Sequence, residues 1–283
     1  MRTLVHLSDL HFGRVDPQLL DPLRDLVHKL APNVVVVSGD LTQRAKSEQF
    51  EEARAWLDTL PGPQIIVPGN HDISLYNVFR RFLAPLDRYK RYITDDLDPV
   101  YIDDEIAVLG VNTARSLTFK DGRVNKEQVE KIRATLSGLA PDITRVVVTH
   151  HPFDLPRGEE NKGAKEDDLV DRAHMAMDVF AELGVDLLMA GHLHMSHAGN
   201  TQARYKISEY AALVVQAGTA TSTRGRGEVN SFNVIRIEPQ RIEVDRYGWD
   251  SVHNQFQVLN TEKFMRSGNV WTEVPDGMMA AGL

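Results

Sequence analysis

Acidic residues, histidines and one asparagine stand at the ends of five apolar segments of this chain. One group is Gly69-Asn70-His71-Asp72, which follows the apolar residues 64–67. It offers an amide oxygen, a titratable imidazole and a carboxylate at one point, and a hydrolytic metal site can use all three. Gly-Asn is also a common turn, and His71 could be a surface residue. The other four segments therefore decide between the two interpretations.

Two of those segments lie nearer the N-terminus. Asp9 and His11 follow the strand-like residues 3–8. Residues two apart in a strand point to the same side, so both could reach one ion; a solvated loop is the alternative. Asp40 follows the β-branched residues 34–37, which are typical of a strand buried on both faces. Its two oxygens could bridge two ions, or it could cap the next turn.

Histidines end the two remaining segments. Residues 144–149 lead to His150, and residues 185–190 lead to His192 and His194. Neighbouring side chains of extended backbone point to opposite sides, so at most one of His150 and His151 is a ligand. We expect His150 to bind the metal, and His151 to lie behind the ligands without binding it. The other histidines are interpreted as structural or surface residues: His6, His28, His174, His197 and His253. Five such strand ends are hard to explain as unrelated loops, so the residues predict a metal site.

Alternating strands and helices would bring these groups together. Apolar spacing predicts helices at residues 17–30, 47–60, 75–92, 125–136 and 168–183. Further strands are expected at residues 100–102, 106–111, 213–217, 231–237 and 241–247. The polar residues 157–167 predict an exposed loop that could cover the site. Residues 223–227 are a Gly-rich loop without the Gly-Lys-Ser/Thr of a P-loop. Open α/β sheets bind ligands at the carboxyl edge, where the five groups would lie.

The composition narrows the classes of function. The chain has 283 residues, no cysteine and a net charge of −8. Without cysteine, any metal must be held by nitrogen and oxygen atoms. The negative net charge argues against broad nucleic-acid binding, but not against a small phosphorylated substrate. There is no apolar run long enough to span a membrane and no signal-peptide pattern, so we expect a cytoplasmic protein.

The length allows one large α/β domain with an appendage. We expect a catalytic domain at residues 1–250. Residues 251–283 would form a C-terminal extension that packs on this domain or on the partner of a homodimer.

The five groups, in this order, resemble the signature blocks of the calcineurin-like metallophosphoesterases. The blocks are Asp9-Leu10-His11, Gly39-Asp40, Gly69-Asn70-His71-Asp72, His150 and Gly191-His192-Leu193-His194. Within that superfamily the chain looks closest to class III cyclic-nucleotide phosphodiesterases and their glycerophosphodiesterase relatives. The resemblance implies a four-layer α/β/β/α sandwich of two mixed β-sheets flanked by helices.

The resemblance also implies a site for two metal ions. One ion would be held by Asp9, His11, Asp40 and His194, and the second by Asp40, Asn70, His150 and His192, with Asp40 bridging. Oxygen and nitrogen ligands suit manganese or iron, with zinc as a further option. A hydroxide between the ions would attack phosphorus. His71 is assigned to stabilise or protonate the leaving oxygen, with Asp72 or another carboxylate holding its ring; a structural role is the alternative.

The expected function is therefore the metal-dependent hydrolysis of a small phosphodiester, with a 3',5'-cyclic nucleotide as the favoured substrate. A phosphomonoesterase, a glycerophosphodiesterase or a nucleotide-linked lipid pyrophosphatase could use the same site. A non-catalytic metal-binding or protein-interaction module with this fold is the alternative of another class. The complete ligand set favours the enzyme.

Overall fold

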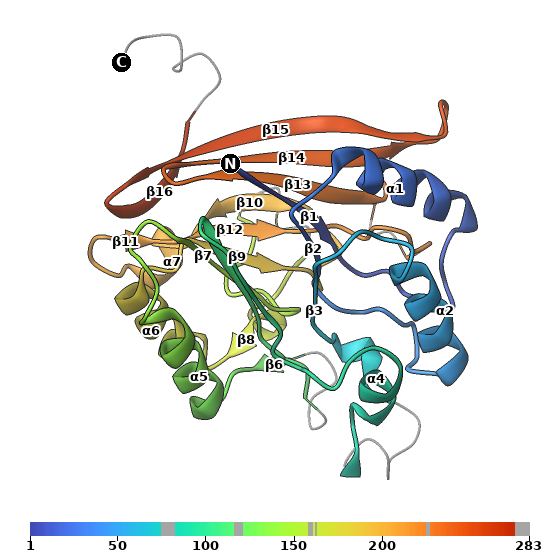
Figure 1. Cartoon of the computed structure of the whole chain (residues 1–283), viewed down its shortest axis with the longest axis horizontal. Helices are drawn as coiled ribbons and strands as arrows, with labels where there is room; N and C mark the ends of the chain where they lie inside the picture. Colours follow the sequence, from blue (N-terminus) through green and yellow to red (C-terminus); the bar gives the residue numbers. More distant parts are fainter. Residues whose placement is uncertain (75–82, 116–120, 158–160, 162, 225–226, 275–283) are drawn as a thin grey trace.

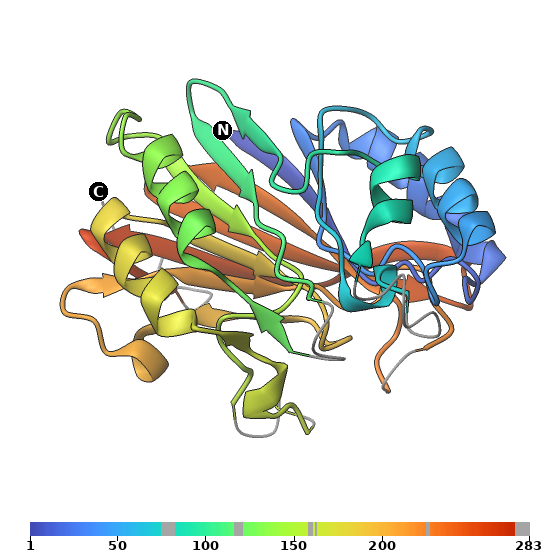
Figure 2. The same cartoon turned by 90° about the horizontal axis from the view of Figure 1, so that it is seen from below.

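Two β-sheets lie face to face, and helices cover their outer faces (Figure 1). The computed structural model describes residues 1–74, 83–115, 121–157, 161, 163–224 and 227–274. Seen from below, the helices of the first third of the chain and those of the middle third lie on opposite sides of the sheets (Figure 2). The predicted α/β/β/α sandwich is confirmed.

The first sheet combines strands from the two ends of the chain. Its order is β11-β16-β15-β14-β13-β1-β2-β3. The strands are β1 (Arg2–Leu7), β2 (Val34–Val37), β3 (Gln64–Ile66), β11 (Tyr210–Ala211), β13 (Ser231–Glu238), β14 (Arg241–Asp250), β15 (Gln255–Ser267) and β16 (Asn269–Glu273). Strands β1, β2 and β3 are parallel, whereas β13 runs antiparallel beside β1. The C-terminal strands therefore extend the same sheet that the N-terminal strands begin.

The second sheet has the order β10-β12-β9-β7-β5-β4. Its strands are β4 (Val100–Ile102), β5 (Ile106–Gly110), β7 (Thr144–Val148), β9 (Leu187–Ala190), β10 (His197–Asn200) and β12 (Leu213–Gln216). Strands β5, β7, β9 and β12 are parallel to one another. A separate two-stranded sheet pairs β6 (Gly122–Arg123) with β8 (Val170–Asp171).

The helices form where apolar spacing and capping residues agree. They are α1 (Pro17–Leu30), α2 (Ser47–Leu57), α4 (Asp87–Tyr92), α5 (Lys126–Leu136), α6 (Ala173–Leu183) and α7 (Gln202–Tyr205), with short 3-10 helices η1 (Asn70–Asp72) and η3 (Glu166–Asp168). The Asp16 side chain accepts a hydrogen bond from the amide of Gln18 at the start of α1. At the start of α5, the Asn125 side chain accepts from the amide of Gln128 in the same way.

Three layers of apolar side chains hold the sandwich together. Alternate residues of each strand face opposite sides, so β1 sends Leu4 between the sheets and Val5 toward the helices. Leu23 of α1 and Phe50 of α2 pack on the outer face of the first sheet. Helices α5 and α6 cover the second sheet in the same manner. Because β2 and β7 are buried on both faces, their sequences do not alternate: β2 is four valines, and β7 is β-branched at every position except Arg145.

The structure corrects several boundaries. The helix predicted at 168–183 begins at Ala173, because Val170–Asp171 pairs with β6 and Arg172 has a φ of 64°. Within the helix predicted at 75–92, residues 75–82 lie outside the described residues, and α4 begins at Asp87. The predicted loop at 157–167 also lies partly outside them, and its role as a cover stays a prediction.

Residues beyond 250 were expected to form an extension. They contain β15, which pairs with β14 along its length, and β16, which pairs with β15. The division of the chain at residue 250 stays a prediction.

Candidate metal centre

Loops from both sheets meet at the carboxyl ends of β1, β2, β3, β7 and β9. Backbone hydrogen bonds join these loops directly. The amide of Asp9 donates to the carbonyl of Gly39 at 3.1 Å, and the amide of His11 donates to the carbonyl of Asp40 at 2.9 Å. Within the second sheet, the amide of Gly191 donates to the carbonyl of His150 at 3.1 Å, and across the two sheets the amide of His192 donates to Asp9 Oδ2 at 3.1 Å. All eight predicted site residues are therefore brought together.

Five of these residues adopt the left-handed backbone conformation that non-glycine residues rarely use. The φ angles are 53° for Asp9, 52° for His11, 54° for Asp40, 70° for His192 and 57° for His194. Each such residue costs about 1–3 kcal/mol, and such residues cluster at functional sites. The fold thus holds these side chains in orientations that ordinary strand ends would not give.

Asp9, His11, Asp40 and His194 form the first cluster, and all four are buried. Their nearest ligand atoms lie within 4.8 Å of one another. The Asp9 Oδ1 atom is 3.3 Å from His194 Nε2 and 3.5 Å from His11 Nε2. These are the four residues that the resemblance assigns to one metal ion.

The second cluster surrounds the amide oxygen of Asn70. This Oδ1 atom lies 3.0 Å from His150 Nε2 and 3.2 Å from His192 Nδ1. Asp40 stands between the two clusters, with Oδ1 3.5 Å from His150 Nε2 and Oδ2 3.8 Å from His11 Nε2. One oxygen of Asp40 therefore faces each cluster, which is the arrangement that a bridging carboxylate needs.

His151 lies on the same side as His150, which differs from the expectation of opposite sides. The two ring centroids are 4.9 Å apart, and His151 belongs with His150 and His192 to one group of potential ligands. Strand alternation does not apply because β7 ends at Val148. The Nδ1 atom of His151 lies 2.8 Å from Thr113 Oγ1. That His151 lies behind the ligands and does not bind the metal stays a prediction.

Two histidines are oriented through the nitrogen that faces away from the clusters. The carbonyl of Ser38 lies 2.8 Å from His150 Nδ1, and Thr219 Oγ1 lies 2.8 Å from His194 Nδ1. Asp168 Oδ1 lies 3.7 Å from His192 Nε2, which is an ion-pair distance and too long for a hydrogen bond. Partners of this kind fix the tautomer and the ring orientation of metal-binding histidines.

None of these partners is predicted by the sequence. Ser38 directly precedes the Gly39-Asp40 group, so its position was the one available signal. Asp168 lies in the short helix η3 and Thr219 in a loop, and neither has a recognisable spacing.

The polar atoms of the first cluster fit a metal ion. Asp9 Oδ1 and both ring nitrogens of His11 are buried, and no hydrogen-bond partner for them is found in the described part of the chain. Burying such an atom unsatisfied costs about 1–3 kcal/mol. Burial alone would raise the pKa of Asp9, but His194 and His11 outweigh it and hold the pKa well below its usual range. An anionic carboxylate beside unsatisfied imidazole nitrogens is a suitable donor set for a cation.

His71 lies beside this centre, and its ring is held differently from the prediction. Its amide donates to Asp40 Oδ1 at 2.8 Å. The ring Nδ1 lies 2.8 Å from the carbonyl oxygen of Gln43, and the ring Nε2 lies 2.9 Å from Arg224 Nη1. Because a guanidinium only donates, Nε2 accepts and Nδ1 carries the proton.

The prediction that Asp72 or another carboxylate holds the His71 ring was therefore wrong. Asp72 instead accepts from the amides of Leu41, Thr42 and Gly69, which ties the loop after β2 to the loop after β3. Burial and the nearby Asp40 raise the pKa of Asp72 to about 6. Its role in this structure is to position the loops.

Arg224 is a site residue that the sequence analysis missed. It lies in the Gly-rich loop that was set aside for lacking a P-loop pattern. A single arginine between Thr223 and Gly225 carries no spacing signal, and only the fold brings it to His71.

Close packing of backbones explains one of the glycines in the blocks. A Cβ atom on Gly69 would lie 2.1 Å from Asp40 Oδ1 and 2.4 Å from the Asp40 amide nitrogen. Only glycine therefore allows the loop after β3 to approach the proposed bridging carboxylate.

No helix of the described residues is long and apolar enough to cross a membrane.

Comparison with known proteins shows which family contains these site residues. The chain matches the family model described as calcineurin-like phosphoesterase over residues 2–196. Glycerophosphodiester phosphodiesterase GpdQ of Enterobacter lignolyticus (strain SCF1) is 30% identical over 175 residues, which cover 55% of this chain and 58% of that protein. The chain thus matches a little over half the length of this curated relative.

A solved structure shows the same fold. Purple acid phosphatase PPD1 from yellow lupin (Lupinus luteus) seeds superposes with a TM-score of 0.66 at 13% identity, covering 93% of this chain and 53% of that one. The family match spans well over half of the residues and contains every predicted ligand. The chain therefore belongs to the calcineurin-like phosphoesterase family.

Proposed function

We propose that this protein is a two-metal phosphodiesterase that hydrolyses small phosphodiesters. The observation that carries the proposal is the position of Asp40, which turns one oxygen toward each of two clusters of ligand atoms. Asp9, His11 and His194 would hold one ion with Asp40. Asn70, His150 and His192 would hold the other. Manganese and iron suit this donor set, and zinc is a further option.

Two ions held there supply a water molecule of lowered pKa and offset the charge of the phosphate oxygens. The residues of the chain supply the remaining requirements. Asp40 fixes the His71 amide, and Gln43 fixes the His71 ring. His71 Nε2 and the Arg224 guanidinium together face the place where the leaving oxygen of a bound diester would lie. Arg224 can donate there to an oxygen that gains negative charge.

Two classes of diester are the candidate substrates. The relative that shares 30% identity is named as a glycerophosphodiester phosphodiesterase, which supports glycerophosphodiesters. The motif blocks suggested a 3',5'-cyclic nucleotide, and the closer resemblance to class III cyclic-nucleotide phosphodiesterases stays a prediction. A phosphomonoesterase and a nucleotide-linked lipid pyrophosphatase would use the same ligands. The screen below therefore includes substrates of all four kinds.

The proposal is tested with purified protein loaded with manganese. We expect hydrolysis of bis(p-nitrophenyl) phosphate, and a loss of about 10³-fold or more in kcat/KM in Asp40→Ala. Asp142→Ala, which removes an exposed acid in a loop, is the matched control. A rate in Asp40→Ala equal to that of the control would exclude the proposal. Cyclic nucleotides, glycerophosphodiesters, p-nitrophenyl phosphate and nucleotide-linked lipids then rank the substrates.

The non-catalytic module is the alternative of another class. It predicts a protein that binds about two metal ions per chain and hydrolyses none of these substrates. The cytoplasmic location and the homodimer stay predictions.

A further inference from the structure

A serine stands directly before the first predicted ligand, and its hydroxyl contacts that ligand. Ser8 is buried, and its Oγ atom lies 2.7 Å from Asp9 Oδ2. The carbonyl oxygen of Ser38 is farther from the same hydroxyl, at 3.4 Å. A hydroxyl has one hydrogen to donate, and a short bond to an ionised acceptor is the stronger of the two. Ser8 therefore donates to Asp9 Oδ2.

The two oxygens of Asp9 have different surroundings. Oδ2 has a second donor, the amide of His192, at 3.1 Å. Oδ1 has no hydrogen-bond partner among the described residues, and it lies 3.3 Å from His194 Nε2 and 3.5 Å from His11 Nε2. Protein donors thus hold Oδ2, whereas Oδ1 faces the first cluster of ligand atoms.

The glycine before His192 confines the Ser8 hydroxyl to this position. A Cβ atom on Gly191 would lie 1.8 Å from Ser8 Oγ and 2.8 Å from Asp9 Oδ2. Only glycine lets the backbone come so close to both side chains. The same approach brings the His192 amide within reach of Asp9. The two donors on Oδ2 are therefore part of one packed arrangement.

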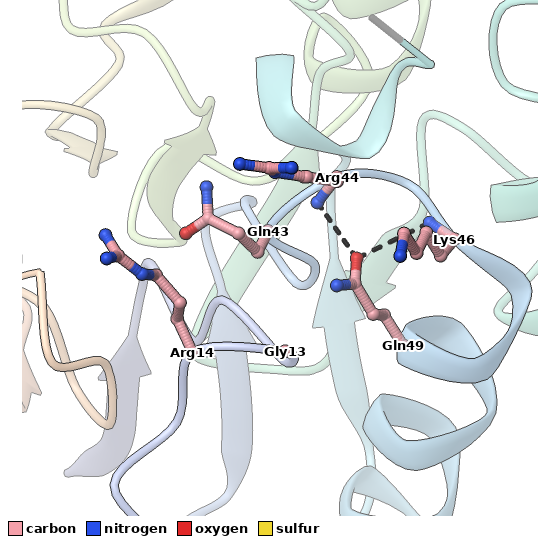
Figure 3. Close-up of a pocket in the computed structure, with 6 residues that line it drawn as sticks. All are labelled: Gly13, Arg14, Gln43, Arg44, Lys46 and Gln49. Atoms are coloured by element: carbon pink, nitrogen blue, oxygen red, sulfur yellow. Dashed lines mark hydrogen bonds between the residues drawn. The ribbon is translucent and has the colours of Figure 1, made fainter. Parts of the chain in front are cut away.

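The backbone near the site is fixed by contacts that do not involve Ser8. A bridge joins the loop after β1 to the loop after β2. Farther along the second loop, Gln49 Oε1 accepts from the amides of Arg44 at 2.9 Å and Lys46 at 3.4 Å, and Figure 3 shows both bonds. Loss of the Ser8 hydroxyl should therefore act on the Asp9 carboxylate and leave these loops in place.

We propose that Ser8 is a positioning residue of the metal centre, whose hydroxyl occupies one oxygen of Asp9 so that the carboxylate gives a single oxygen, Oδ1, to an ion. The inference rests on the proposed function, because it requires a metal ion at the first cluster. Carboxylates bind ions through one oxygen or through both. Hydrogen bonds to a ligating carboxylate orient it and tune the affinity for the metal. Ser8 thus sets how Asp9 binds and how tightly the first ion is held.

Metal binding tests this role without turnover. Manganese is titrated into the metal-free protein, and electron paramagnetic resonance counts the free ion. We expect the wild type to bind about two ions, and Ser8→Ala to bind one of them about 10–100-fold more weakly. Ser137→Ala, which removes an exposed hydroxyl at the end of α5, is the matched control and should keep both affinities. Equal affinities in Ser8→Ala and the control would overturn the inference.

A spectrum separates positioning from a merely structural role. The visible absorption of bound cobalt(II) weakens as its coordination number rises. At saturating cobalt we expect weaker absorption per ion in Ser8→Ala than in Ser137→Ala, because Asp9 Oδ2 loses its hydroxyl donor and turns toward the ion. Weakened binding with an unchanged saturated spectrum would overturn the inference, since Ser8 would then only support the fold.

The two measurements also keep this inference apart from the proposed function. A wild type that binds two ions but hydrolyses no diester would count against the proposed function alone. The affinities and spectra would still decide the role of Ser8 in that case. A wild type that binds no metal would overturn both.

Discussion

The Nη1 atom of Arg224 lies 2.9 Å from the Nε2 atom of His71, although 153 residues separate them in the chain. His71 lies inside the segment that matches the family, and Arg224 lies beyond its end at residue 196. Burial lowers the pKa of the His71 imidazole despite the nearby Asp40, and Arg224 adds to the lowering. A neutral ring that accepts from a guanidinium therefore stands beside the proposed leaving oxygen.

The first prediction concerns the leaving group. His71→Gln keeps the amide that donates to Asp40 but removes the imidazole. We expect kcat/KM for an alkyl diester such as glycerophosphoglycerol to fall about 10²–10³-fold, because the imidazole that accepts from Arg224 positions the guanidinium that donates to the leaving oxygen. Bis(p-nitrophenyl) phosphate, with a stable leaving group, should lose much less. His28→Gln, at a histidine that binds the Thr59 carbonyl, is the control. Equal losses for both diesters would contradict the assignment.

The second prediction concerns metal content. Asp40 lies near ring nitrogens of both clusters, whereas Asp9 lies near ring nitrogens of the first cluster and accepts only a backbone amide, that of His192, from the second. We expect the wild type to bind about two metal ions per chain, Asp9→Ala to retain about one, and Asp40→Ala to retain fewer than one. Elemental analysis after gel filtration measures these values. Equal metal content in the two variants would argue against a bridging position for Asp40.

The third prediction uses the close approach of Gly69 to Asp40. The Cβ of Gly69→Ala would lie too close to the Asp40 backbone nitrogen for a side-chain rotation to relieve it. We expect a loss of about tenfold or more in kcat, because small displacements of site groups cost much activity. Gly138→Ala is the matched control, since nothing lies within 4 Å of a Cβ there. Activity of Gly69→Ala equal to that of the control would show that the loop has room to move.

The fourth prediction concerns pH and His6. Burial lowers the pKa of His6 to about 3, and its Nε2 lies 2.9 Å from Ser38 Oγ. The unfolded chain binds a proton at this histidine near its usual pKa, and the folded chain does not. Stability from His6 is therefore present above the unfolded pKa and is lost as the pH falls toward the folded pKa.

Urea unfolding at two pH values measures this effect. Between pH 7 and pH 5.5 the wild type should lose about 1 kcal/mol more unfolding free energy than His6→Gln. Comparing the two proteins at each pH cancels the titration of all other groups. An identical loss in both would mean that His6 is protonated in the folded state.

The fifth prediction concerns Asp186, which joins the sheets. Its Oδ1 accepts from Trp271 Nε1 at 3.1 Å and from Arg266 Nη1 at 2.9 Å, and its Oδ2 accepts from the amide of Arg145. Asp186→Ala leaves a half-buried guanidinium and a buried indole N–H without their acceptor. We expect a loss of about 3 kcal/mol in unfolding free energy. Asp142→Ala should lose under about 0.5 kcal/mol, as an exposed substitution. If Asp186→Ala lost as little unfolding free energy as the control, Asp186 would not be joining the two sheets.

The sequence could place the predicted ligands near one another because each follows a strand of the sandwich within about four residues, and their role as metal ligands stays a prediction. Residues 34–37, for example, are four valines, and such a run has few alternatives to a buried strand. The carboxyl edge of the sheet then follows from topology alone. Helix α1 was predicted to its observed bounds for a similar reason, with Asp16 and Pro17 at its start.

The other site residues and strands could not be predicted, because their positions depend on contacts between residues that are distant in the sequence. Asp168 in the short helix η3, and Thr219 and Arg224 in loops, lie in segments whose local sequence has no periodic pattern. His151 was placed by strand alternation, which ends with β7. Strands β15 and β16 alternate poorly, and their pairing with β14 decides their conformation. Tertiary contacts, rather than local propensity, fix these elements.

Strand β1 pairs with one strand that is close to it in the sequence, β2, and with one that is distant, β13. Val5 pairs with Val35 on one side and with Val234 on the other. On the ribosome, one flank of β1 is thus covered soon after it emerges, while the other stays an unpaired edge until β13 has been made. Such edges recruit foreign strands, and pairings this distant in sequence form slowly. The nascent chain therefore needs its edge shielded through most of translation, and premature termination before β13 would release a fragment prone to aggregate.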